Sequence, residues 1–119
     1  QPNTTLFRSH FRATKYTDTT AENLKQALEE ETYDFKNAYP PMVQDAVNDD
    51  ALEARHSLEY GMSIGPVITK LISKAIGNSD ADESGSYYVC PVCGNIEFGQ
   101  APAKCPFCGV DASDFVSVS

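Results

Sequence analysis

The four cysteines of this 119-residue chain constrain its fold more than any other feature. They form two C-P-x-C-G units near the carboxyl end, and we call each unit a knuckle. A C-x-x-C turn directs two sulfurs at one point, and the following glycine lets the backbone fold back so that its N–H groups face the sulfurs. Disulfides between sulfurs so close in sequence are strained, whereas two such turns close a tetrahedral cage that selects zinc or iron. The predicted metal ligands are Cys90, Cys93, Cys105 and Cys108.

The residues around these cysteines resemble rubredoxin. Residues 88–94 (YVCPVCG) are similar to its first knuckle, and residues 105–110 (CPFCGV), followed by Phe115, are similar to its second. The short interval between the knuckles matches the compact rubredoxin-like domain that ends rubrerythrins. Asn95 stands where that family usually has an aromatic residue. The resemblance implies one iron ion held as Fe(Cys)4, with structural zinc as the alternative.

A helix is expected to begin at Thr19, which forms a capping box with Glu22. Glu31 falls on its apolar stripe and Asp34 follows one turn later, and a carboxylate on a buried face needs an ionic partner or a metal. Pro40-Pro41 should break or kink this helix, which resumes to about Val47. The stripe itself recurs at helical spacing and consists of Leu24, Leu28, Phe35, Ala38 and Met42.

Residues 19–47 resemble the third helix of the ferritin-like domain of rubrerythrins. The matching features are the string TAENLK, the two acidic positions and Tyr39-Pro40. In that family both acidic positions are di-iron ligands. The resemblance therefore implies Glu31 and Asp34 as candidates for a second metal site.

A second helix should follow a turn at residues 48–50, with Asp50 as its N-cap and Glu53 at N3. Glu53 and His56 also form an E-x-x-H pair that can hold a metal, and residues 53–60 (EARHSLEY) resemble the di-iron helix of the family. In a hairpin that turns here, however, Glu31 faces about residues 65–68, several turns from this pair. The family's own Glu and His fall at Gly65 and Ile68. The alternative roles are capping for Glu53 and a hydrated surface for the other three candidates.

The chain is thus expected to be mainly α, with a helical hairpin of ferritin-like type and a small rubredoxin-like metal domain with short β-strands. Gly65-Pro66 should end the second helix and start a third, which ends at Gly77. We divide the chain into an arm (1–18), a helical region (19–77), a linker (78–86) and the rubredoxin-like domain (87–119).

Charge and hydropathy narrow the choice of partners. A net charge of -8 argues against a general nucleic-acid or anionic-membrane role. The sequence has no apolar run of the roughly 20 residues that span a bilayer and no recognisable signal sequence, so a cytoplasmic protein is expected. Its start at Gln1 is typical of a processed or truncated chain. Because a two-helix hairpin cannot bury its stripe alone, a homodimer or docking on a larger protein is expected.

Electron transfer through a mononuclear Fe(Cys)4 centre, with a protein redox partner, is the predicted function. Resemblance to rubrerythrins implies that this transfer supports peroxide reduction, although the incomplete di-iron ligand set leaves open whether the chain is an enzyme. The alternative is an accessory subunit with a structural zinc knuckle in a larger assembly. Iron handling by a helical dimer is a third interpretation.

Overall fold

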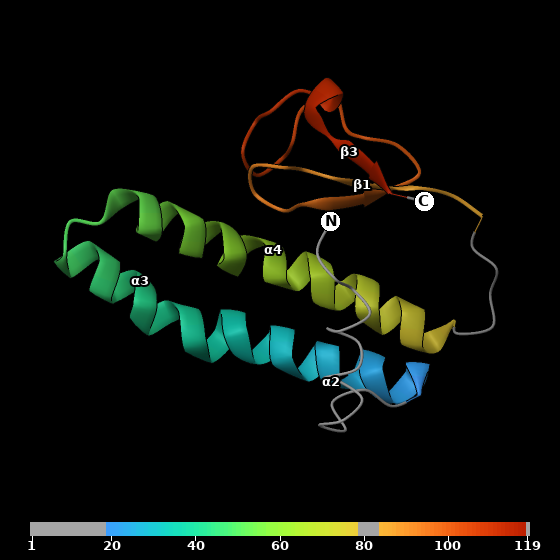
Figure 1. Ribbon diagram of the computed structural model, residues 1–119, viewed down its shortest axis with the longest axis horizontal. Helices are drawn as coiled ribbons and strands as arrows, with labels where there is room; N and C mark the ends of the chain where they lie inside the picture. The colour runs from blue at the N-terminus through green and yellow to red at the C-terminus, as the bar shows by residue number, and fades with distance from the viewer. Residues whose placement is uncertain (1–18, 79–83, 119) are drawn as a thin grey trace, which may run out of the picture.

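The computed structural model describes residues 19–78 and 84–118, so the predicted N-terminal arm and most of the linker lie outside the described part. Within it, a long helical hairpin carries a small antiparallel sheet on one side (Figure 1). The predicted fold class, mainly α with a few short strands, is confirmed. The helical elements are α2 (Thr20–Tyr33), η1 (Asp34–Ala38), α3 (Tyr39–Asn48) and α4 (Leu52–Gly77).

The first helix begins where its capping residues predict. The Thr19 hydroxyl accepts the backbone N–H of Glu22 at 3.2 Å, and the Thr19 backbone is extended. This contact satisfies one of the N–H groups that a helix start leaves without an intrahelical partner. The start of α2 is therefore determined by residues that are neighbours in sequence.

A π-helical turn, η1, joins α2 to α3 just before the proline pair that was expected to break or kink the helix. The Tyr39 N–H donates to the Asp34 carbonyl, five residues back, and the prolines occupy the first positions of α3. The wider turn keeps the chain helical although Pro40 and Pro41 have no N–H to donate. Of the predicted break or kink, the break does not occur, because the chain stays helical from η1 through α3 to Asn48.

The extra residue in η1 also rotates everything after it by about 100° around the helix axis. Met42, assigned to the buried stripe by counting from Phe35, is consequently 49% exposed. Ala46 is buried instead, and Tyr39 faces α4. The stripe predicted through Met42 is correct only up to the π turn.

The turn between α3 and α4 differs from the predicted N-cap. Asp50 has a φ of 53°, in the left-handed region, and its backbone carbonyl accepts the N–H of Leu52. The residue before α4 is Ala51, whose N–H donates to the Ala46 carbonyl at 2.8 Å, and no side chain caps this helix start. Asp50 closes the tight turn with its backbone and is not the N-cap.

One continuous helix, α4, runs through Gly65-Pro66, where a boundary between two helices was predicted. A proline inside a helix removes one backbone hydrogen bond and costs about 3 kcal/mol. Packing offsets this cost, because Ile64 and Gly65, just before the proline, are buried. The predicted third helix is thus the second half of α4.

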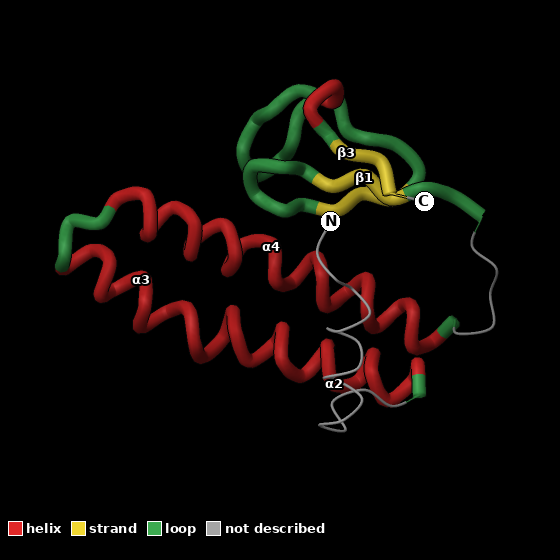
Figure 2. The backbone as a smooth tube through the Cα atoms, in the orientation of Figure 1, coloured by secondary structure: helices red, strands yellow, loops and turns green. Residues whose placement is uncertain are grey.

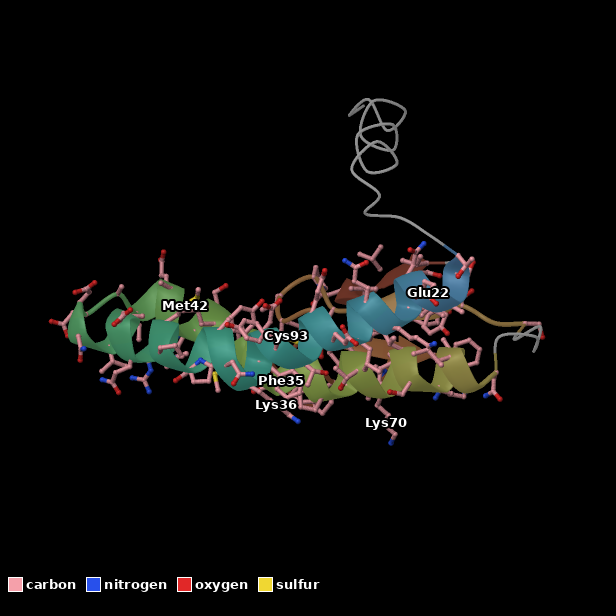
Figure 3. The ribbon with its side chains drawn as sticks, turned by 90° about the horizontal axis from the view of Figure 1, so that it is seen from below. Glu22, Phe35, Lys36, Met42, Lys70 and Cys93 are labelled. Atoms are coloured by element: carbon pink, nitrogen blue, oxygen red, sulfur yellow. The ribbon has the colours of Figure 1, made fainter. Side chains whose placement is uncertain are left out.

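Two glycines of α4 allow the two arms of the hairpin to approach closely. A Cβ added at Gly61 would lie 2.8 Å from Cε2 of Tyr39, and one added at Gly65 would lie 2.6 Å from Cγ of Phe35. Figure 3 shows Phe35 about midway along the hairpin. Aromatic rings thus pack directly on the backbone of α4.

The C-terminal domain, residues 84–118, contains a three-stranded antiparallel sheet with β1 in the centre (Figure 2). It lies on the face of α4 opposite α2 and α3 (Figure 1). The strands are β1 (Tyr87–Val89), β2 (Ile96–Phe98) and β3 (Val116–Val118). No helix in the described ranges is long and apolar enough to cross a membrane.

We expect Gly65→Ala to lower the free energy of unfolding by about 1–3 kcal/mol. The added methyl would meet Cβ and Cγ of Phe35, and rotation of the Phe35 ring cannot move these atoms away. Urea unfolding followed by circular dichroism measures the change. Gly77→Ala is the matched control: a Cβ there meets nothing within 4 Å, so its higher helix propensity should leave stability equal or slightly higher. Equal losses in both variants would contradict the close approach.

Candidate metal centre

The two knuckles have the same backbone construction. The Cys90 N–H donates to the Asn95 carbonyl and the Cys105 N–H to the Val110 carbonyl, each at 2.8 Å. The glycine after each second cysteine closes the turn, with Gly94 at φ 83° and Gly109 at φ 82°. Only glycine adopts this conformation without strain. The sequence therefore forms two equivalent turns, each presenting a pair of sulfurs.

The four predicted cysteine ligands come together in one place. Their sulfurs all lie within 4.8 Å of one another, and they are the one group of three or more metal-ligating side chains found in residues 19–78 and 84–118. Two Sγ–Sγ distances are 3.4 Å (Cys90 to Cys108) and 3.5 Å (Cys93 to Cys105), too long for a disulfide. Four sulfurs about 2.3 Å from one ion would be about 3.8 Å apart, so this cage fits a tetrahedral metal.

Backbone N–H groups favour thiolates in part of the cage. Burial raises the pKa of the Cys105 thiol, but the N–H groups of Cys108 and Phe107 stabilise its thiolate and bring the pKa down to about 7. Burial raises the pKa of the Cys93 thiol, and the N–H of Asn95 opposes this rise only in part. A bound cation would supply the positive charge that four adjacent thiolates require.

Asn95, which replaces the family's aromatic residue, is completely buried beside the cage. Its Nδ2 donates to Oε1 of Glu97 at 3.0 Å, while its Oδ1 has no hydrogen-bond partner. An amide thus fills the place of a ring, with its donor side turned to a carboxylate.

One side of the cage is covered by α4. Ile64 belongs to the same buried cluster as Cys90, Cys93 and Cys105, and Tyr60 and Ile68 pack against that cluster. This cover was not predicted from the sequence. Its signal was present, because Tyr60, Ile64 and Ile68 recur every four residues, directly beside the glycines that face the other helices.

Two of the carboxylates proposed for a second metal belong to the other arm of the hairpin. Glu31 is half-buried on α2 and Asp34 is half-buried at the start of η1. Burial first, and then the charges of Asp34 and Glu31, raise the pKa of the Tyr39 hydroxyl. These three side chains therefore form one acidic group, and the ring of Phe35 fills the space at Gly65, where the family's glutamate falls.

Glu53 and His56 lie apart from that acidic group. Both are exposed, in the first turns of α4, whereas the Phe35–Gly65 and Tyr39–Gly61 contacts place Glu31 toward the other end of the hairpin. His56 instead borders a groove between α4 and the second knuckle, lined also by Glu59, Tyr60, Ser63 and Phe107. A second metal at Glu31, Asp34, Glu53 and His56 stays a prediction.

Glu31 gives a pH-dependent test of this assignment. Burial, and then the charge of Asp34, raise its pKa, so the ionised form destabilises the fold at neutral pH. We expect Glu31→Gln to raise the melting temperature at pH 7 by about 1–2 °C, since the side chain is still partly hydrated. The difference should vanish as the pH falls below the ordinary carboxyl pKa of about 4.3, because both side chains are then neutral.

Thermal melts of Glu31→Gln from pH 4 to pH 8, with iron analysis of the same samples, measure both properties. Glu29→Gln, an exposed change on the same helix, is the matched control for removing one carboxylate. Loss of iron from Glu31→Gln, with Glu29→Gln unaffected, would instead establish Glu31 as a ligand.

Known proteins match parts of this sequence. Residues 88–116 match the family described as "Rubrerythrin, rubredoxin-like domain". Rubrerythrin-2 of Clostridium acetobutylicum is 28% identical over 97 residues, covering 79% of this chain and 53% of the relative. Nigerythrin of Nitratidesulfovibrio vulgaris is 27% identical over 86 residues, covering 72% of this chain and 43% of the relative. The chain thus spans about half the length of these curated relatives.

Solved structures of nigerythrin have the same fold. The fully reduced, all-ferrous state gives a TM-score of 0.78 at 24% identity and covers 86% of this chain and 50% of nigerythrin. The partially reduced state gives a TM-score of 0.79 at the same identity. Four clustered cysteines in a rubredoxin-like domain fit an Fe(Cys)4 site. The resemblance to the rubrerythrin family is thus confirmed, with residues 88–116 as its rubredoxin-like domain.

Proposed function

We propose that this protein transfers single electrons through one iron ion bound by Cys90, Cys93, Cys105 and Cys108. The observation that carries the proposal is the sulfur cage within a rubredoxin-like domain. When bound, iron supplies a one-electron ferric–ferrous couple. The electron comes from a protein redox partner of lower potential and leaves to an acceptor of higher potential.

The residues of the knuckles hold the sulfurs so that a change of charge needs little rearrangement. Backbone N–H groups at Asn95, Phe107, Cys108 and Val110 donate to the sulfurs and offset their negative charge. Three cysteines are buried, whereas Cys108 is partly exposed. The second knuckle is therefore the side on which a partner comes nearest to a sulfur ligand.

Peroxide reduction is the use of these electrons that the relationship to rubrerythrins favours. Reduction of hydrogen peroxide to two waters consumes two electrons and two protons, so a one-electron carrier must deliver twice. We place that step on a partner, because Phe35 fills the helical level at which the family's ligands fall. The chain then acts as the electron carrier of a peroxide-reducing system.

Protein produced with iron should bind one iron per chain, be red when oxidised and bleach on reduction. Cys93→Ser should abolish the red form, because the cage loses a thiolate on its buried side. Metal analysis with visible spectra before and after dithionite checks both expectations. Val92→Ala is the matched control, since Val92 lies in the same knuckle but is 55% exposed.

A colourless protein that holds zinc even when iron is supplied in excess would overturn electron transfer. That outcome would favour the accessory subunit with a structural zinc knuckle. More than one iron per chain, with the excess lost in Glu31→Gln, would support a second, helical metal site.

We further propose that a second copy of the chain completes the helical region. Several apolar side chains of the hairpin are exposed, and the relatives that the chain matches are about twice as long as the matching part. Two hairpins would supply four helices, which can bury both apolar faces. The exposed side chains are Tyr33, Met42, Val47 and Leu52, at 60%, 49%, 41% and 59%.

Light scattering coupled to gel filtration should give twice the mass of one chain. Met42→Glu should shift the protein toward the single-chain mass, because the charge would be buried between copies. Val116→Glu, an equally exposed position on β3, should leave the dimer intact. A single-chain mass for the unaltered protein at all concentrations would rule out the second copy as occupant.

A further inference from the structure

The largest buried side chain of the described helices, Ile64, packs against the metal domain. Ile64 is 2% exposed, and its cluster consists of the buried cysteines Cys90, Cys93 and Cys105. The hairpin contact of α4 is made on a different face, at Gly61 and Gly65. Figure 3 shows Phe35 and Cys93 at the same level along the hairpin, so the two contacts involve one segment of α4.

A second contact fixes the metal domain along α4. Lys74 Nζ lies 5.8 Å from the centre of the Phe98 ring, a cation–π arrangement. The same ring packs on the backbone of Gly85, where an added Cβ would lie 2.5 Å from Cζ. Lys74 is ten residues beyond Ile64, or about 15 Å along the helix. Two separated contacts therefore determine which residue of α4 lies over the cage.

We propose that Ile64 is a positioning residue of the metal centre: it seals the sulfur cage from water and links metal binding to the stability of the helices. Tyr60 and Ile68 extend the seal by one turn on either side. The effect on redox potential depends on the proposed iron centre. The link between metal and helices holds for any tetrahedral ion in the cage.

The direction of the redox effect follows from charge. The reduced form of a four-thiolate iron site carries one more negative charge than the oxidised form. An apolar cover disfavours the more highly charged form, because water would stabilise it. Opening the seal should therefore stabilise the reduced form and raise the potential.

Ile64→Asn should raise the ferrous-to-ferric ratio at a fixed ambient potential about tenfold, which is about 59 mV for a one-electron couple. It should also speed iron loss to a chelator at least about tenfold, because water reaches the sulfurs. Ile64→Leu, which keeps the apolar cover, should keep the ferrous-to-ferric ratio and the rate of iron loss within about twofold of the unaltered protein. Redox titration and chelator kinetics on the full chain measure these effects.

Ile72→Asn is the matched control, since it makes the same change on α4 at a half-buried isoleucine outside the cysteine cluster. It should leave the potential and the rate of iron loss unchanged even if it lowers the melting temperature. If Ile64→Asn and Ile72→Asn change both values equally, or if neither changes them, Ile64 does not seal the cage.

Zinc provides a test that does not depend on iron. Loading the metal-free protein with zinc should raise the melting temperature of the helices, because an ion that organises the knuckles also organises the surface on Ile64. Ile64→Asn should lose most of this rise, whereas Ile72→Asn should keep it. The protein could prove colourless and bind only zinc, and still lose the zinc-dependent rise in Ile64→Asn. That outcome would contradict the proposed electron transfer but not the link between metal binding and helix stability. An equal rise in all three proteins would defeat the link alone.

Discussion

The packing of α4 between two unlike partners is the interaction on which the rest of this molecule depends. On one face the backbone at Gly61 and Gly65 lies directly under the aromatic rings of η1 and α3, and on another Ile64 packs with the buried cysteines. Neither contact would suffice alone for a chain of this size, because few of its described residues are fully buried. The helix thus connects the hairpin with the metal domain as one structure.

Within the metal domain, sulfur takes the place of a hydrophobic core. The buried side chains of residues 84–118 are those of three cysteines and Asn95, while Val92, Phe107 and Val116 are exposed. Cohesion therefore depends on what the thiolates bind and on the cover that α4 provides. This explains how so short a segment folds with three-residue strands, which would not be stable by themselves.

Local signals predicted their parts of the structure, and signals that depend on distant packing did not. The cysteine spacing predicted the cage and Thr19 predicted the helix start, because each acts through its neighbours in sequence. The helical stripe failed at Met42, since a π turn changes the period at a point that the residue pattern does not mark. Pro66 predicted a helix boundary because its cost is local, whereas the packing that overrides it comes from both sides of α4.

The candidate site was predictable to the same extent. The cysteine spacing predicts that the four cysteines come together. The cover by α4 could not be predicted, because apolar residues four apart on a helix are equally typical of packing against another helix or against a sheet.

The position of α4 also determines which segment of the chain undergoes local unfolding least often. Residues near Ile64 are released only when both the metal domain and the hairpin separate, whereas the two ends of the helix are held from fewer sides. Amide hydrogens around this residue should therefore exchange with solvent most slowly. This slow segment contains Gly61, Gly65 and Pro66, residue types with the lowest intrinsic tendency to be helical. The most persistent part of the helix is thus the part that an isolated peptide would lose first.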